Sequence, residues 1–129
     1  MNKHLVTVLV SIIIMVMLTC TIKADENMIT KRGGVFYLDD GESKHKETYY
    51  NLSMRRITAI AKERIHPNWQ YWEREDGMKM FGPFIMVVAN QKVHPYGSTV
   101  LTSRGLGIVV DTGGFAKNNP TQIDIAVTW

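Results

Sequence analysis

The chain reads Val109-Val110-Asp111-Thr112-Gly113-Gly114 and then, thirteen residues after Asp111, Ile123-Asp124-Ile125. Each aspartate stands at the boundary of a β-branched apolar run, and such runs are typical of buried strands. We therefore expect both carboxylates to emerge from buried strands into one pocket that the glycines leave open. The alternative is that Asp111 only caps the turn that follows it, since Asp and Gly are common turn residues.

Strand patterns continue through the last third of the chain. Residues 84–89 form an apolar run, residues 99–102 and 107–110 flank a hairpin turn, and residues 122–129 close the chain. Short strands with glycine and proline between them favour a small closed barrel. We predict a mainly β fold of the α+β type.

A helical pattern precedes these strands. Apolar residues recur at intervals of three or four between residues 52 and 65, and charged residues fall between them. Asn51 or Ser53 is expected to cap the beginning of this helix, and Pro67 to end it. The narrow apolar stripe and the mixed charges favour packing on the strands over binding to a membrane surface.

Aromatic residues gather among charged ones between residues 66 and 83. Rings with charged neighbours are typical of sugar-binding clefts, because a ring face stacks on the apolar face of a pyranose. The alternative is that these rings belong to the core, given the area that each one buries. Trp72 from this segment and Tyr49 from before the helix are candidate substrate-binding residues.

The amino end has the pattern of an export signal. Lys3 precedes an uncharged apolar stretch over residues 5–22, and Lys23 follows it. The stretch predicts a signal peptide over residues 1–24 or an uncleaved membrane anchor. A cleaved signal is favoured, since the stretch is at the lower length limit of a spanning helix; a lipoprotein signal at Cys20 is a third, weaker interpretation. We expect a secreted or cell-envelope protein.

The exported part divides at residue 48. Residues 25–48 are polar and rich in charge, apart from a short apolar run at 35–38. Burial of so polar a segment does not offset its ordering entropy, so we predict a polar tether that contains one short strand at the apolar run. Residues 49–129 form the single expected domain, with a helical insertion over residues 51–80.

Charge and composition exclude several classes of protein. The formal net charge is +3, and Lys3 and Lys23 of the export segment account for two of these charges. A nearly neutral domain without a basic stripe argues against nucleic-acid binding. The exported part has no cysteine, and His45, His66 and His94 lack the spacing of a zinc site. We expect no metal and no cofactor.

Five short motifs keep a characteristic order: residues 87–90 (Val-Val-Ala-Asn), 95–100 (Pro-Tyr-Gly-Ser-Thr-Val), 105–108 (Gly-Leu-Gly-Ile), 111–114 (Asp-Thr-Gly-Gly) and 123–124 (Ile-Asp). This order and spacing resembles the bacterial three-aspartate (3D) domain. That domain is similar to the C-terminal part of MltA-type lytic transglycosylases and to RlpA-like double-psi β-barrels. The resemblance covers residues 84–129.

The resemblance implies a small six-stranded double-psi β-barrel with one or two accessory helices, acting on the glycan strands of peptidoglycan. Asp111 matches the first aspartate of the family. Asp124 matches the second, which in the related transglycosylases is the proposed catalytic acid/base. The sequence departs from the family at Thr128, the expected position of the third aspartate, and at residues 48–50 (Thr-Tyr-Tyr), where the family has Thr-Ala-x-Gly.

A lytic transglycosylase requires one carboxyl group that holds its proton at rest, and therefore a partly desolvated acid. Asp124, with an isoleucine on each side, is the better candidate for a raised pKa, while Asp111 is expected to stay ionised. The segment after Asp111 supplies four further candidate binding residues: Thr112, Gly113, Gly114 and Lys117. Glycine lets the backbone approach a substrate closely, and the lysine could bind an acidic group of the glycan.

Three classes of function follow from these patterns: a peptidoglycan-cleaving enzyme, a module that binds glycan without cutting it, and a structural or partner-binding envelope protein. The two retained aspartates favour the first class, and Thr128 favours the second. Contact with a membrane is expected only through an uncleaved anchor at residues 5–22.

Overall fold

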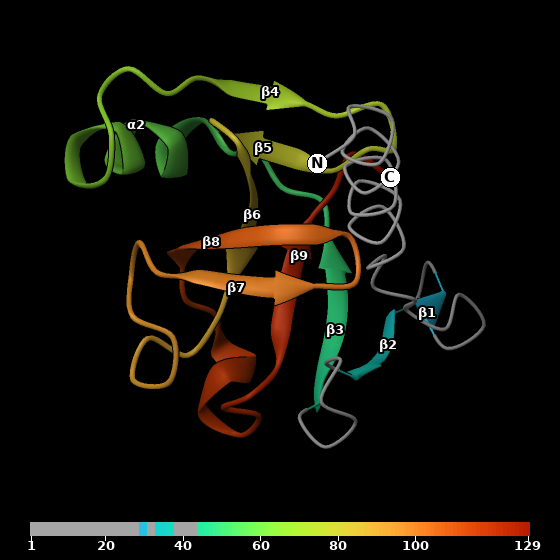
Figure 1. Cartoon of the computed structure of the whole chain (residues 1–129). Coiled ribbons are helices and arrows are strands. Elements are labelled where there is room, and N and C mark those ends of the chain that lie inside the picture. Colours follow the sequence, from blue (N-terminus) through green and yellow to red (C-terminus); the bar gives the residue numbers. More distant parts are fainter. Residues whose placement is uncertain (1–28, 31–32, 38–43) are drawn as a thin grey trace, which may run out of the picture.

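The computed structural model describes residues 29–30, 33–37 and 44–129, and within them the chain is mainly β with one α-helix (Figure 1). The helix is α2 (Arg55–Arg64), and η1 (Gly114–Lys117) is a short 3₁₀ turn. In chain order the strands are β1 (Ile29–Thr30), β2 (Gly33–Tyr37), β3 (Lys44–Tyr50), β4 (Tyr71–Glu73), β5 (Lys79–Phe81), β6 (Phe84–Val88), β7 (Thr99–Thr102), β8 (Gly105–Asp111) and β9 (Ile123–Ala126).

The predicted signal or anchor over residues 1–24 lies outside the described residues. Within the described ranges, no helix has the length and apolar character needed to cross a membrane.

All the described strands belong to one mixed sheet, and β6 lies at its centre. β8 runs parallel to β6 on one side, while β5 and β9 lie antiparallel to it on the other. β9 pairs in parallel with β3, and the sheet continues from there to β2 and β1. β7 folds back on β8 as the predicted hairpin, which crosses in front of β9 in Figure 1.

An extra residue in β8 shifts its register against β6. Val87 pairs with Val109, but the next residue, Val88, pairs with Asp111, so Val110 is the additional residue. Strict alternation would turn Asp111 to the face occupied by Val109. The bulge instead sets Asp111 opposite Val88, and the two side chains share a face.

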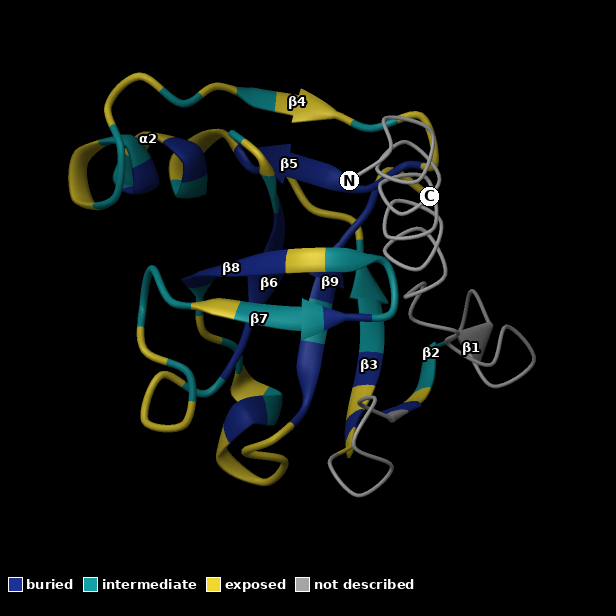
Figure 2. Ribbon diagram, in the orientation of Figure 1, coloured by how far each residue is buried: buried dark blue, intermediate teal, exposed yellow. Residues whose placement is uncertain are grey.

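Apolar side chains cover both faces of the sheet, which is why the central strands are dark blue in Figure 2. The face that packs against Val100 of β7, here called the hairpin face, buries Met78, Met80, Ile85, Val87, Ala89, Val109, Ile123, Ile125 and Val127. The face covered by α2, here called the helix face, buries Met54, Ala61, Phe81, Met86, Ile108, Val110 and Ala126.

Helix α2 lies within the predicted range, but its beginning differs from the prediction. The N-cap is Met54, and no side chain caps the helix. Asn51 instead accepts a hydrogen bond from Lys79 Nζ at 2.8 Å and donates one to the carbonyl of Thr128 at 3.0 Å. The expected cap by Asn51 or Ser53 was wrong, because the nearly buried ammonium of Lys79 takes the Asn51 oxygen.

The predicted tether over residues 25–48 does not include Lys44–Thr48. These residues belong to β3, which pairs with β2 and β9, so the boundary expected after residue 48 falls inside a strand. The short strand expected at 35–38 is β2. The segment expected as a helical insertion, residues 51–80, also contains β4 and the beginning of β5. The sheet therefore has more strands than the six that were predicted.

A buried carboxylate fastens the β7–β8 hairpin to β3. Glu47 accepts hydrogen bonds from the backbone N–H of Ser103, at 3.0 Å, and from the Ser103 hydroxyl. Its other partner is His45 Nε2 at 2.8 Å, and both residues of this pair are buried. Three polar groups thus depend on one carboxylate in the interior.

We predict that Glu47→Ala lowers the free energy of unfolding by about 3 kcal/mol, since it leaves buried donors without an acceptor. Lys46→Ala is the matched control: Lys46 is the exposed neighbour in β3, and its loss should change stability by less than about 0.5 kcal/mol. Denaturant unfolding of both variants measures the difference. Equal midpoints would show that Glu47 does not hold the hairpin.

Candidate active site

The two aspartates lie on either side of the same residue of β6. Val88 pairs with Asp111 of β8 on one side and with Asp124 of β9 on the other. Directly paired residues point to the same face of a sheet, so both carboxylates belong to the helix face. Their Cα atoms are about 10 Å apart, twice the spacing between neighbouring strands. That distance is too long for the carboxyl groups to share one proton.

Asp124 is half-buried, and this burial disfavours its charged form relative to an aspartate in water. Burial raises the pKa of this carboxyl above its ordinary value, and the hydrogen bond from Thr48 Oγ1 to Asp124 Oδ1, at 3.0 Å, opposes the rise. Burial is the larger effect. The prediction of a raised pKa for Asp124 is thus confirmed in direction.

Asp111 has a different environment at the end of β8. One of its carboxylate oxygens accepts a hydrogen bond from the backbone N–H of Thr112 at 2.8 Å. This is the turn contact that the capping interpretation expected. It does not exclude a role in the site, because Asp111 shares its face with Asp124.

Two tyrosines lie near the aspartates: the charges of both aspartates affect Tyr50, and that of Asp111 affects Tyr96. Burial raises the pKa of the Tyr50 phenol, and the negative charges of Asp124 and then Asp111 raise it further. Burial also raises the pKa of Tyr96; Arg64 opposes this rise and Asp111 adds to it. The phenols therefore lie within electrostatic reach of the carboxylates. The Tyr96 hydroxyl is buried and has no hydrogen-bond partner within the described residues.

An open groove of about 540 Å³ lies beside Asp111, where the chain leaves β8. Three of the predicted binding residues, Thr112, Gly113 and Lys117, line it together with Asn90. A side chain at Gly113 would come within 2.9 Å of the Phe115 ring and 3.4 Å of Val88, the residue between the two aspartates. Glycine is thus needed there for close packing. A Cβ at Gly114 would meet only open space.

Tyr49 and Trp72, the other predicted binding residues, are not part of this site. Tyr49 follows Thr48 in β3 and points to the hairpin face, where it packs against Trp129 with ring centroids 4.9 Å apart. Trp72 pairs with Met80, which also belongs to the hairpin face, and the residue is 44% exposed.

The position expected for a third aspartate is also remote. Thr128 is exposed beyond the end of β9, where its backbone N–H donates to Gly77. Four residues of extended chain place it about 13 Å from Asp124.

Sequence reasoning missed three residues of the site. Thr48 and Tyr50 pair with Asp124 and Ala126 across the parallel β3–β9 ladder, so they share the helix face. Only the alternation of β3 could have indicated this, and β3 itself was not predicted. Asn90 lies two residues beyond Val88 and binds the Ala116 carbonyl of η1 at 3.0 Å; its place in the motif at residues 87–90 was the available signal.

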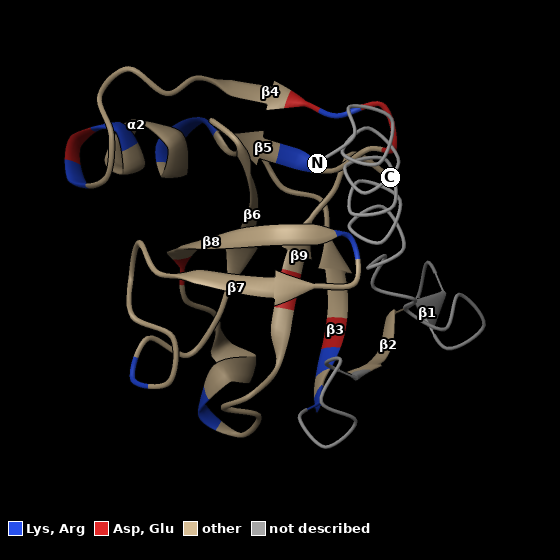
Figure 3. Cartoon of the chain, viewed as in Figure 1, with Lys and Arg blue, Asp and Glu red and all other residues tan. Residues whose placement is uncertain are grey.

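The described ranges contain no group of His, Cys, Asp or Glu side chains that could hold a metal ion. Figure 3 shows why the aspartates stand out: β6 and β7 carry no charged residue, and Asp111 and Asp124 are the charged residues of β8 and β9. The arrangement provides one carboxyl group with raised pKa, a second carboxylate on the same face, and a groove next to it. These groups suit proton transfer to a polar ligand.

Comparison with models of protein families, with curated proteins and with solved structures finds no match for this chain.

We predict that Asp124→Asn stabilises the protein at neutral pH, because the folded state no longer holds a partly desolvated charge. The folded pKa of Asp124 lies above the unfolded value, so wild-type stability from this group is full at acid pH and is lost as pH rises through the folded pKa. The gain in Asp124→Asn should therefore grow with rising pH over the same interval. Denaturant unfolding across a pH series measures it.

The control for this series is Asp76→Asn, which should lower the free energy of unfolding at neutral pH, whereas Asp124→Asn should raise it. The hydrogen bond from Arg74 is the main cause that holds the pKa of Asp76 below its usual range, so its stabilising effect is present at neutral pH and lost in acid. If both variants change stability in the same direction, the assigned environment of Asp124 is wrong.

Proposed function

We propose that the protein cleaves cell-wall glycan in the manner of a lytic transglycosylase acting on peptidoglycan, with Asp124 as the acid/base. The observation that carries the proposal is the half-buried carboxyl of Asp124, whose pKa is raised by burial and which shares a face of the sheet with a second carboxylate. The proposed substrate, peptidoglycan, rests on the resemblance of residues 84–129 to the three-aspartate domain. On the same resemblance we propose that the sheet belongs to the double-psi β-barrel family.

The proposed reaction needs a single proton carrier. Asp124 gives its proton to the glycosidic oxygen as the bond to the anomeric carbon breaks. The resulting carboxylate then takes the proton of the sugar's own 6-hydroxyl, whose oxygen attacks the anomeric carbon and closes an anhydro ring. The acid is regenerated, and no water is consumed.

The separation of the two aspartates supports a one-acid mechanism. At about 10 Å between Cα atoms, twice the strand spacing, Asp111 is not among the causes that shift the pKa of Asp124. A carboxylate at Asp111 would stabilise the positive charge that develops on the sugar ring. Thr112, Gly113 and Lys117 would hold the neighbouring part of the glycan in the groove.

A second candidate is a peptidoglycan-binding module without catalysis, and one observation favours it. Thr48 donates a hydrogen bond to Asp124, and this bond stabilises the carboxylate, the form that accepts hydrogen bonds from sugar hydroxyls and has no proton to donate. The exposed indole of Trp72 offers a stacking surface on the hairpin face, separate from the aspartates. Binding and cleavage would then use different faces.

The activity test is product release from purified peptidoglycan, read by mass spectrometry for anhydro-muramyl ends. Asp124→Asn should reduce release to background, because an amide of the same shape carries no transferable proton. Asp111→Asn should reduce it less, by at most about a hundredfold, since it removes electrostatic support alone. Unchanged release in Asp124→Asn would refute the catalytic assignment.

The pH profile provides a control within the same assay. Cleavage by wild type should fall as pH rises through the pKa of Asp124, because the ionised group cannot protonate the leaving oxygen. Thr48→Val removes the hydrogen bond that opposes this raised pKa, so the falling limb should move to higher pH. Thr128→Val, at an exposed position, should leave the profile where it is.

Retention on insoluble peptidoglycan separates binding from catalysis. If the protein is a binding module that stacks sugar on Trp72, Trp72→Ala should lose retention while Asp124→Asn keeps it, and no anhydro product should form at any pH. If it is an enzyme, Trp72→Ala should still form product. A pull-down and a product assay on one preparation of each variant give both readings.

A further inference from the structure

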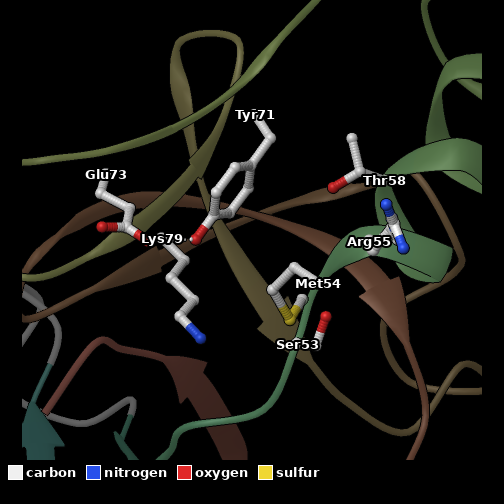
Figure 4. Close-up of a pocket in the computed structure, with 7 residues that line it drawn as sticks. All are labelled: Ser53, Met54, Arg55, Thr58, Tyr71, Glu73 and Lys79. Atoms are coloured by element: carbon white, nitrogen blue, oxygen red, sulfur yellow. Dashed lines mark hydrogen bonds between the residues drawn. The ribbon is translucent and has the colours of Figure 1, made fainter.

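A second pocket, of about 470 Å³, opens where helix α2 begins (Figure 4). The segment before the helix, its first turn, and strands β4 and β5 form the walls. The lining side chains that matter here are Met54, Arg55, Thr58, Tyr71, Glu73 and Lys79. The mechanism proposed above uses none of them.

Thr58 brings an unsatisfied hydroxyl to this pocket. The residue is only 9% exposed, and its Oγ1 has no hydrogen-bond partner within the described residues. In Figure 4 the hydroxyl points toward the middle of the pocket. The carbonyl of Met54 accepts the backbone N–H of Thr58 at 2.8 Å, and the Thr58 hydroxyl does not share this acceptor. A buried hydroxyl without a partner is costly, so an acceptor in the pocket would relieve it.

The beginning of α2 makes the same end of the pocket electropositive. No side chain caps the helix, and its first turn contains no acidic residue. The free backbone N–H groups of a first turn carry partial positive charge and bind anions. Arg55 is exposed at the first helical position, and its guanidinium makes no ion pair within the described part of the chain.

The remaining charged groups limit how much negative charge fits. The Lys79 ammonium is already bound to Asn51 Oδ1 at 2.8 Å and to the Leu52 carbonyl at 2.6 Å. Glu73 lies across the pocket from Arg55 in Figure 4, and its carboxylate accepts the Tyr71 hydroxyl at 2.8 Å. A dianion would be repelled by Glu73, whereas a single negative charge can sit at the Arg55 end.

We propose that this pocket binds a small ligand through a carboxylate group. The carboxylate accepts hydrogen bonds from the first-turn N–H groups of α2, from Arg55 and from the Thr58 hydroxyl, and the rest of the ligand lies against Met54 and Tyr71. The proposal does not depend on glycan cleavage, because binding is measured without turnover.

The test is a titration of the ¹⁵N-labelled full chain with sodium acetate, with ionic strength held constant by sodium chloride. The backbone amides of residues 55–58 should shift in a saturable manner. Sodium phosphate at a pH where it is mainly the dianion should bind at least about tenfold more weakly. Arg55→Gln should weaken acetate binding roughly tenfold, while Arg56→Gln, the exposed neighbour outside the pocket, should have a much smaller effect.

Thr58→Val gives the sharper result, because it should have two opposite effects. Removing the unsatisfied hydroxyl should raise the melting temperature of the ligand-free protein, and it should weaken acetate binding about threefold or more. A site that is merely a packing defect would give the first effect without the second. Equal affinities for acetate in wild type, Arg55→Gln and Thr58→Val, or tighter binding of phosphate than of acetate, would overturn the proposal.

Discussion

The bulge in β8 is the constraint on which the site depends. β6 pairs with β8 in one register up to Val87 and in another from Val88 onward, and Val110 is the residue that makes the difference. In an unbroken ladder Asp111 would point into the hairpin face, among apolar side chains such as Val109 and Ile125. A charged carboxylate there would need a partner or a proton. The bulge removes that conflict and places Asp111 on the same face as Asp124.

The same face shows how two carboxylates in one sheet acquire different surroundings. Asp124 lies within β9, where burial outweighs the single hydrogen bond from Thr48. Asp111 lies at a strand end, with the backbone N–H of Thr112 as a donor and an open groove beside it. Because both side chains are aspartate, their surroundings differ only through their positions: Asp124 lies inside its strand and Asp111 lies at the end of its strand. Tyr50 packs among the helix-face residues, and its pKa responds to both charges.

The sequence predicted β6 to β9, whose residues are mainly apolar, and missed β3, whose interior is polar, as well as the short strands β1, β4 and β5. In β3 the exposed lysines, Lys44 and Lys46, alternate with buried His45 and Glu47. The hydrophobicity pattern predicts that this segment is exposed to solvent. The hydrogen bonds that allow Glu47 to be buried, from His45 and from Ser103, exist only in the folded chain. The residues that β3 brings to the site, Thr48 and Tyr50, were missed for the same reason. The two aspartates were found because apolar runs border them, but the bulge that aligns them has no signature in the local sequence.

Most of the groups that destabilise this fold lie on the helix face. The hairpin face has a continuous apolar cluster, and the buried Glu47 beside it has its partners. The helix face holds the uncapped beginning of α2, the buried Thr58 hydroxyl without a partner in the described chain, and the half-buried Asp124. The second hydroxyl of this kind belongs to Tyr96, whose ring lies against the Arg64 guanidinium of α2. Natural sequences violate local rules of stability mainly where a site requires it. The hairpin face therefore stabilises the fold, while the helix face contains the groups that destabilise it. We expect ligands to bind on the helix face.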